Sequence, residues 1–173
     1  MSYPIIFLVI ASNGYQQIEY ETTKKFLEKA NFKVVTASDK PGAVSNNQTP
    51  AIVDITLDNI STTAYDGIFF IGGSGALDHL DIPLSYHLLS EAHKHNKIYG
   101  AICIAPRILA KAGVLKGKHA TGWNGDNALP GIFDGYDVTY VDKPVVRDGN
   151  IITASGPQAS ADFAQEIINI FRL

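Results

Sequence analysis

Three segments of the chain carry residue types that could take part in nucleophilic chemistry. They are Glu19, the run Gly-Gly-Ser-Gly at residues 72–75, and Cys103, which is the only cysteine. Each lies close behind a short apolar stretch that is typical of a buried strand. In open α/β sheets, ligands bind just beyond the carboxyl ends of the strands, so we expect the three segments to converge on one site.

Cys103 stands between the apolar run Tyr-Gly-Ala-Ile at 99–102 and a helix-like segment that contains Pro106 near its start. Ala101 and Ala105 stand two positions on either side, as a nucleophile elbow requires where a strand and a helix approach closely. The unpaired N–H groups and the dipole of the helix would favour a thiolate there, so the position predicts a lowered pKa for Cys103. The alternative is a small buried cysteine that only packs.

The glycines at 72–75 free the backbone to approach a ligand, and their N–H groups could stabilise an oxyanion beside the thiolate. An ordinary turn between a strand and a helix, or a phosphate-binding loop of the flavodoxin sort, would use the same residues. Neither the full phosphate-loop pattern nor the dinucleotide-binding pattern is present. The glycine run alone therefore does not predict an oxyanion-binding site; it does so only together with Cys103.

Glu19 comes directly after Ile18, near the start of a predicted helix that faces the sheet. A carboxyl group that is half-buried there would be protonated more easily than usual. If neutral, it could donate a hydrogen bond to a thiolate, and if ionised, it could act as a general base. The alternative is a glutamate that merely stabilises the start of the helix through the helix dipole.

Alternating strands and helices must position these residues. Apolar strands are predicted at 5–11, 32–37, 66–71 and 97–102, and amphipathic helices at 18–30, 84–95, 105–112 and 160–171. This alternation predicts an α/β fold, namely a flavodoxin-like doubly wound, mostly parallel sheet sandwiched by helices. In the first helix, Ile18, Phe26, Leu27 and Ala30 recur at near-helical spacing and should pack on the sheet.

Three further segments have their own patterns. Residues 46–58 alternate between apolar and polar types after turn residues, which predicts a small antiparallel accessory hairpin. Residues 122–135 are rich in Gly, Asn, Asp and Pro and lack a period, so we expect a long surface loop or lid. Short strands are predicted at 138–141, 145–147 and 151–154.

Composition narrows the function classes. The chain has 173 residues, 46% of them hydrophobic, which suits one domain over residues 1–173. A net charge of -3 with 18% charged residues leaves no basic stripe for nucleic acid. The apolar run at 4–11 is too short to cross a bilayer, so we expect a cytoplasmic protein without membrane contact. One cysteine and five scattered histidines predict neither a metal site nor a bound cofactor.

Four segments in this order resemble the ThiJ/PfpI superfamily, also called the DJ-one superfamily, whose fold is of the class I glutamine amidotransferase type. They are Ile-Glu at 18–19, Phe-Ile-Gly-Gly-Ser at 70–74, Gly-Ala-Ile-Cys-Ile-Ala-Pro at 100–106 with Leu-Ala-Lys-Ala-Gly-Val-Leu-Lys-Gly-Lys at 109–118, and Ile-Thr-Ala-Ser-Gly-Pro at 152–157. The resemblance implies that Cys103 is the nucleophile and Glu19 its protonated partner. It also implies oxyanion donors at the N–H groups of Gly73 and Ile104, and a homodimer.

The chain departs from the superfamily at two positions. Members that look like intracellular peptidases carry His directly after the nucleophile, whereas this chain has Ile104, which puts peptidase or amidase activity in doubt. In two other branches a His follows the elbow by about twenty positions, and here Trp123 stands there. His119 precedes a predicted strand and should lie on the surface, toward the opposite edge of the sheet.

The resemblance also suggests which residues line a pocket around Cys103. Trp123 could cap the thiol with an apolar wall, or it could simply anchor the loop. Asn124 could add a polar contact from the lid, and Tyr15 and Ser74 are pocket candidates by their positions after strands.

Three classes of function remain open. The first is a cysteine-dependent enzyme that acts on a small electrophile, as a hydratase or a glyoxalase or deglycase does. The second is a non-enzymatic sensor of oxidative stress, chaperone-like in use, in which an oxidant converts Cys103 to sulfenic or sulfinic acid. The third is a flavodoxin-like ligand-binding module, which rests on the glycine-rich turn alone.

Overall fold

The structure is a computed structural model that describes residues 2–173. A central sheet of seven strands has the order β11-β12-β8-β7-β1-β3-β6, and every neighbouring pair is parallel except β11 with β12. Its strands are β1 (Ile5–Ile10), β3 (Lys33–Ser38), β6 (Ile55–Thr56), β7 (Gly67–Phe70), β8 (Ile98–Ile102), β11 (Val145–Asp148) and β12 (Ile151–Ala154). The predicted doubly wound, mostly parallel sheet is confirmed.

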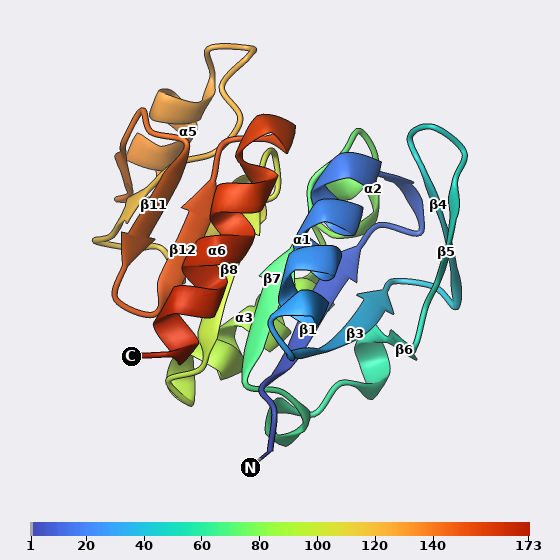
Figure 1. The fold of residues 1–173 in the computed structure, drawn as a ribbon. Coiled ribbons are helices and arrows are strands. Elements are labelled where there is room, and N and C mark those ends of the chain that lie inside the picture. Colours follow the sequence, from blue (N-terminus) through green and yellow to red (C-terminus); the bar gives the residue numbers. More distant parts are fainter. Residues whose placement is uncertain (1) are drawn as a thin grey trace.

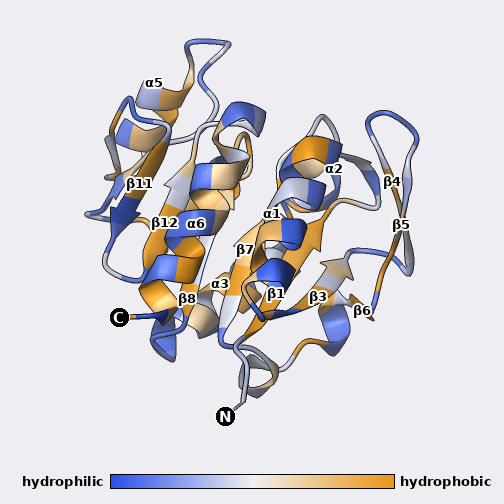
Figure 2. Ribbon diagram, in the orientation of Figure 1, coloured by the Kyte–Doolittle hydropathy of each residue, from blue (hydrophilic) through white to orange (hydrophobic). Residues whose placement is uncertain are grey.

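Helices cover both faces of the sheet. α1 (Gln17–Lys29) and α6 (Ser160–Phe171) pack side by side on one face, while α3 (Pro83–Lys94) and α4 (Pro106–Lys111) contact each other on the other (Figure 1). Because both faces are covered, the inner strands are mainly apolar, which Figure 2 shows as orange stretches along β1 and β7. In β1, Ile6, Leu8 and Ile10 are fully buried, and so are the residues between them that point to the opposite face.

The inward side of α1 differs from the prediction. Glu19, Tyr20, Thr23 and Leu27 are buried, whereas Ile18 is 54% exposed and Phe26 37% exposed. The predicted apolar stripe was therefore wrong except at Leu27 and the half-buried Ala30. Residues outside the predicted stripe face the sheet instead. One of them is Tyr20, whose hydroxyl forms a hydrogen bond with Thr36 Oγ1 at 2.6 Å.

The accessory hairpin forms, with different strands from those predicted. β4 (Gly42–Ser45) pairs antiparallel with β5 (Pro50–Ile52), and β2 (Asn13–Tyr15) pairs with β4 in parallel. Within the segment 46–58, the residues of β6 leave the hairpin and pair with β3, so that they extend the main sheet. Figure 1 shows the hairpin projecting from the sheet next to the start of α1.

Two short helices were missed. α2 (Ala76–His79) follows the glycine-rich turn, and α5 (Leu129–Asp134) lies within the segment that was predicted to be an irregular loop. Turn-forming residues hid α5: Asn124 Oδ1 accepts a hydrogen bond from the N–H of Leu129 at 3.0 Å, and Pro130 suits the first helical turn. A small pair of strands, β9 (His119–Ala120) and β10 (Thr139–Tyr140), flanks this segment.

Candidate active site

Cys103 stands at the carboxyl end of β8, where the chain turns into α4. Its φ angle is +64°, in the left-handed region that side chains disfavour. Two backbone hydrogen bonds fix it there: its N–H donates to the carbonyl of Ala154 at 2.9 Å, and its carbonyl accepts from the N–H of Trp123 at 2.6 Å. The chain therefore makes the sharp turn that a nucleophile elbow requires.

Glycines let three pieces of backbone meet around the elbow. A Cβ atom at Gly72 would lie 2.6 Å from Cys103 Cβ, so only glycine fits between β7 and the nucleophile. A Cβ atom at Gly100 would lie 1.8 Å from the carbonyl oxygen of Ile152, because β8 and β12 approach closely below the elbow. Glycine thus permits close contacts on both sides of the segment that leads to Cys103, with the end of β7 and with β12.

Glu19 reaches the elbow from the first turn of α1. The side chain of Gln16 caps this helix by accepting from the N–H groups of Ile18 at 2.7 Å and Glu19 at 3.3 Å. The N–H of Gln16 donates to the carbonyl of Gly72, and the N–H of Gly72 donates to Glu19 Oε2 at 3.1 Å. These contacts place the carboxyl of Glu19, fully buried, beside the thiol of Cys103.

Burial dominates the electrostatics of this pair. It raises the pKa of Glu19 to about 7, although the contacts with Cys103 and the N–H of Gly72 act in the opposite direction. Burial also raises the pKa of the Cys103 thiol, and the charge of Glu19 raises it further, while the N–H groups of Ile104 and Gly73 lower it. The predicted net lowering of the thiol pKa is therefore wrong, because burial outweighs the two N–H groups.

The N–H groups of Gly73 and Ile104 lie near enough to the sulfur of Cys103 to lower the pKa of its thiol. They come from the glycine-rich turn and from the elbow, as the sequence predicted. Gly73 can take this place because its φ is +123°, and a Cβ atom on it would lie 2.3 Å from the carbonyl oxygen of Gly14. Two donors and one carboxyl group therefore surround a single sulfur atom, an arrangement that can hold negative charge there or on an atom bonded to it.

The structure gives the contacts of the predicted pocket residues, and their place in a pocket stays a prediction. Tyr15 is buried, and its hydroxyl, with a pKa raised by burial to about 12, donates to the carbonyl of Thr49 in the hairpin. Ser74 is exposed on the turn. Asn124 caps α5 instead of offering a free polar contact.

Trp123 lies next to the elbow, since its N–H donates to the carbonyl of Cys103, and it is 38% exposed. Its ring lies against the backbone of Gly125, where a Cβ atom would come within 2.5 Å of the indole. The guanidinium of Arg107, a residue of α4, lies 5.6 Å from the centroid of the Trp123 ring. Trp123 thus anchors the segment at 122–128, which is the alternative left open by the sequence.

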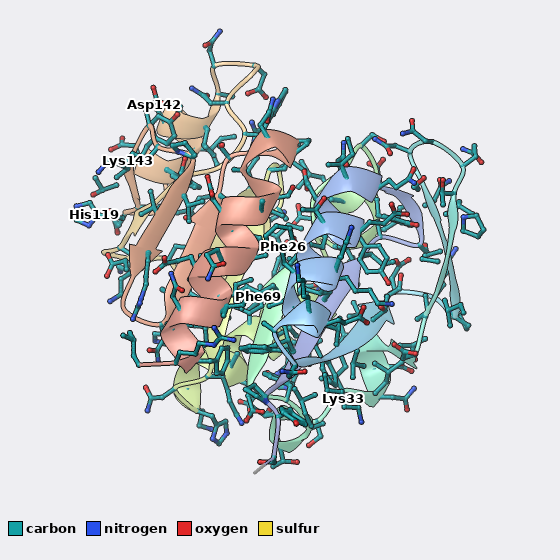
Figure 3. All side chains as sticks on the ribbon, in the orientation of Figure 1. Phe26, Lys33, Phe69, His119, Asp142 and Lys143 are labelled. Carbon is teal, nitrogen blue, oxygen red and sulfur yellow. The ribbon has the colours of Figure 1, made fainter. Side chains whose placement is uncertain are left out.

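His119 lies away from the site. Its ring is exposed, its backbone N–H donates to Asp148 at 2.9 Å, and Figure 3 shows it at the outer edge of the molecule. The expectation of a surface histidine on a distant edge is met.

Sequence reasoning missed one polar cluster at the same edge of the sheet. Asp39 follows β3 and accepts hydrogen bonds from the N–H and the hydroxyl of Ser12, each at 2.7 Å, and His79 Nδ1 lies 3.4 Å from its carboxylate. A census of residues that leave each strand would have found Asp39, had it included the strand at 32–37. The cluster ties the ends of β1 and β3 to α2.

Residues 2–173 offer neither a cluster of metal ligands nor a membrane-spanning helix. No group of three or more metal-binding side chains is placed to hold a metal ion. No helix in this range has both the length and the apolar character needed to cross a bilayer.

Comparisons with known proteins agree with this geometry. The model of the DJ-1/PfpI family matches residues 5–170. The protein dj-1beta of Drosophila melanogaster is 33% identical over 164 residues, which cover 92% of this chain and 86% of that protein. A deglycase of Pyrococcus horikoshii is 25% identical and covers 95% of this chain and 98% of its own length.

Solved structures show the same architecture. The crystal structure of Drosophila melanogaster DJ-1beta matches with a TM-score of 0.88 at 27% identity, over 98% of this chain and 90% of that chain. A ThiJ/PfpI domain protein from Brachyspira murdochii matches with a TM-score of 0.92 at 24% identity, over 99% and 98% of the two chains. With its elbow cysteine and buried glutamate, the chain belongs to the DJ-1/PfpI family.

Proposed function

We propose that this protein is a cysteine-dependent enzyme that acts on small electrophilic carbonyl compounds, with Cys103 as the nucleophile and Glu19 as the proton carrier. One observation carries the proposal: the fully buried carboxyl group of Glu19 lies beside the thiol of Cys103, a residue whose backbone is in the left-handed conformation. Buried titratable pairs and strained residues cluster at functional sites.

The proposed first step is an addition to the carbonyl carbon. Ionised Glu19 accepts the thiol proton as the sulfur of Cys103 attacks, and the electron pair of the C=O π bond moves to the oxygen. Glu19 then returns the proton to that oxygen, which leaves a neutral hemithioacetal and Glu19 ionised as at the start. A pKa of about 7 suits a group that must accept and donate within one cycle.

The N–H groups of Gly73 and Ile104 support the same step. They lie close to the sulfur, where negative charge develops as the thiol loses its proton, and we infer that they also stabilise the oxygen that becomes charged as the bond forms. This addition is shared by hydratase, glyoxalase and deglycase chemistry. The deglycase from Pyrococcus horikoshii among the relatives favours a carbonyl substrate.

The test is consumption of methylglyoxal by purified protein, followed for wild type, Cys103→Ala and Glu19→Gln. We expect Cys103→Ala to abolish turnover, and Glu19→Gln to reduce kcat by at least about 100-fold, as loss of a general base does. Gly131→Ala, on α5, is the matched control, because a Cβ atom there meets nothing within 4 Å. Turnover that survives in Cys103→Ala would contradict the proposal.

A second candidate is an oxidation sensor. The two N–H groups and protonated Glu19 would suit the oxygens of a sulfinate on Cys103. One peroxide molecule would convert the thiolate to sulfenate with release of water, and a second would give sulfinate. With one cysteine in the chain, no internal disulfide can intervene. Intact mass after peroxide treatment should show a gain of two oxygen atoms, and an unchanged mass excludes this function.

We propose a homodimer that uses the outer side of α1 and the β4–β5 hairpin. Ile18 and Ile52, 54% and 85% exposed, lie on these elements, which are joined by a hydrogen bond from Thr49 Oγ1 to Gln17 Oε1 at 3.0 Å. Sedimentation should give a dimer for wild type and a monomer for the double variant Ile18→Asp and Ile52→Asp. A monomeric wild type would contradict this.

The proposed compartment is the cytoplasm, where a lone thiol stays reduced.

A further inference from the structure

A surface groove lies between α1 and α6, the two helices that cover one face of the sheet. Residues of both helices line it, and its volume is about 470 Å³. Sites that bind small molecules usually have volumes of about 300–1,000 Å³. The groove lies beside the last turns of α1, whereas Glu19 and the exposed Ile18 of the proposed dimer surface lie in the first turn. It is therefore separate from the candidate active site.

The floor of the groove is apolar. Phe26 is 37% exposed, and Figure 3 shows it between α1 and α6. Beside it lie Ile168 of α6, which is buried, and Ala30 at the end of α1, which is half-buried against the core. An aromatic side chain that remains partly in water next to such residues offers apolar surface that a ligand can cover.

Three cations border this floor, namely Lys25 and Lys29 on α1 and Arg172 at the end of α6. Within residues 2–173, no acidic side chain lines the groove, and none of the three cations forms a salt bridge. The neighbouring Lys24, by contrast, pairs with Glu28 at 3.9 Å. Since the whole chain has a net charge of -3, the groove is a positive site on an acidic protein.

The ends of the two helices explain only part of this charge. Lys29 and Arg172 lie at the carboxyl ends of α1 and α6, where a cation stabilises the helix dipole. Lys25 lies one turn earlier on α1, beyond the reach of that effect. Its charge therefore remains available to an anion in the groove.

We propose that the groove binds a single-chain amphiphile with a carboxylate head, in other words a fatty-acid-like anion that is free in solution. The hydrocarbon chain covers Phe26 and Ile168, and burial of this apolar surface drives the binding. The carboxylate lies among the cations, which adds a preference for an anion over a neutral ligand. A small hydrophilic anion would leave Phe26 in water, and a neutral apolar ligand would leave the cations without a partner.

Amide chemical shifts measured by NMR on isotope-labelled protein test both features. The ligands are octanoate, below the concentration at which it forms micelles, and octan-1-ol and acetate. We expect octanoate to give saturable shifts in the second half of α1 and in α6. Octan-1-ol should bind at the same place with a Kd that is higher by about threefold or more, because it lacks the charge. Acetate should give no saturable shift.

Two double variants separate the groove from the general charge of the protein. Lys25→Gln with Lys29→Gln should raise the Kd of octanoate by about threefold or more and leave that of octan-1-ol unchanged. Lys24→Gln with Lys33→Gln is the matched control, because it removes two positive charges from residues that do not line the groove. It should bind octanoate as wild type does. Melting temperatures of both double variants check their folding.

Phe26→Ala tests the apolar floor and should raise the Kd of octanoate and of octan-1-ol by a similar factor, about fivefold or more. Equal Kd values for octanoate and octan-1-ol in wild type, or for octanoate in the two double variants, overturn the inference. Groove amides that respond to protein concentration and not to octanoate would assign the groove to a second copy of the chain, which also overturns it. Cys103→Ala should bind octanoate like wild type, so this test is independent of the proposed enzymatic function.

Discussion

The carboxyl of Glu19 and the thiol of Cys103 meet at the carboxyl edge of the sheet, although one begins the first helix and the other ends the strand β8. Between them, the backbone of Gly72 contacts both, donating its N–H to Glu19 and packing its Cα against Cys103. The chemistry of the site therefore depends on three separate strand ends that the sheet holds in register.

The first prediction concerns stability and pH. Burial raises the pKa of Glu19 from 4.5 in the unfolded chain to about 7 in the folded protein, so the folded state binds more protons between these values. The contribution of Glu19 is most favourable below pH 4.5 and is lost as the pH rises through 7. At pH 8, Glu19→Gln should be more stable than wild type by on the order of 3 kcal/mol.

Denaturant unfolding of both proteins at pH 4.5 and pH 8 measures this difference. Taking the difference between variant and wild type cancels the titration of all other groups. A difference that stays constant with pH would show that Glu19 has the same pKa in both states.

The second prediction concerns alkylation of Cys103 by iodoacetamide as a function of pH. In wild type the thiol and Glu19 titrate as a coupled pair, so the rate should rise in two steps, one of them near pH 7. Glu19→Gln leaves one ionisable group and should show one step. Intact mass spectrometry follows the modified fraction, and an unchanged two-step profile in the variant would remove Glu19 from the pair.

The third prediction tests the close approach at Gly72. Gly72→Ala brings a Cβ atom to 2.6 Å from that of Cys103, whose backbone cannot retreat because hydrogen bonds fix it on both sides. We expect loss of stability by about 1–3 kcal/mol, as overpacking gives, and loss of the coupled alkylation profile. Gly131→Ala should instead gain about 0.5–1 kcal/mol, since a helical alanine there has open space. Equal melting temperatures for the two variants would contradict the crowding.

The fourth prediction compares two substitutions of the nucleophile. Cys103→Gly removes the side chain from a residue with φ at +64° and relieves the conformational cost, whereas Cys103→Ala retains it. The glycine variant should be the more stable by roughly 1 kcal/mol, in spite of the general cost of glycine in the unfolded state. Thermal unfolding of both variants decides this. If Ala is the more stable, the elbow stores no conformational strain.

Sequence patterns predicted the strands and the main helices because apolar runs bounded by turn residues reflect burial on both faces of a parallel sheet. They failed for the inner side of α1, where Tyr20 and Thr23 are buried and the Tyr20 hydroxyl forms a hydrogen bond with Thr36, which no period shows. They also missed α5, because Asn124 and Pro130 are loop-forming residues, whereas here Asn124 accepts from the N–H of Leu129 and Pro130 lies in the first turn of the helix.

The site was predictable in its members and not in its electrostatics. Glu19, Gly73 and Cys103 were found by their place after strands. The balance between burial, which raises the thiol pKa, and the two N–H groups, which lower it, depends on three-dimensional packing. Arg107 and Asp126 are nineteen residues apart, and their contact arises only when the segment after β9 folds over α4.

The hydrogen bond from the N–H of Cys103 to the carbonyl of Ala154 links the elbow to the last strand of the sheet. β8 lies between β7 and β12, so one whole side of the nucleophile is missing until residues near the end of the chain have been added. A chain still emerging from the ribosome carries an ordinary, flexible cysteine in water. The backbone geometry of the elbow is therefore completed only after the residues of β12 have been synthesised.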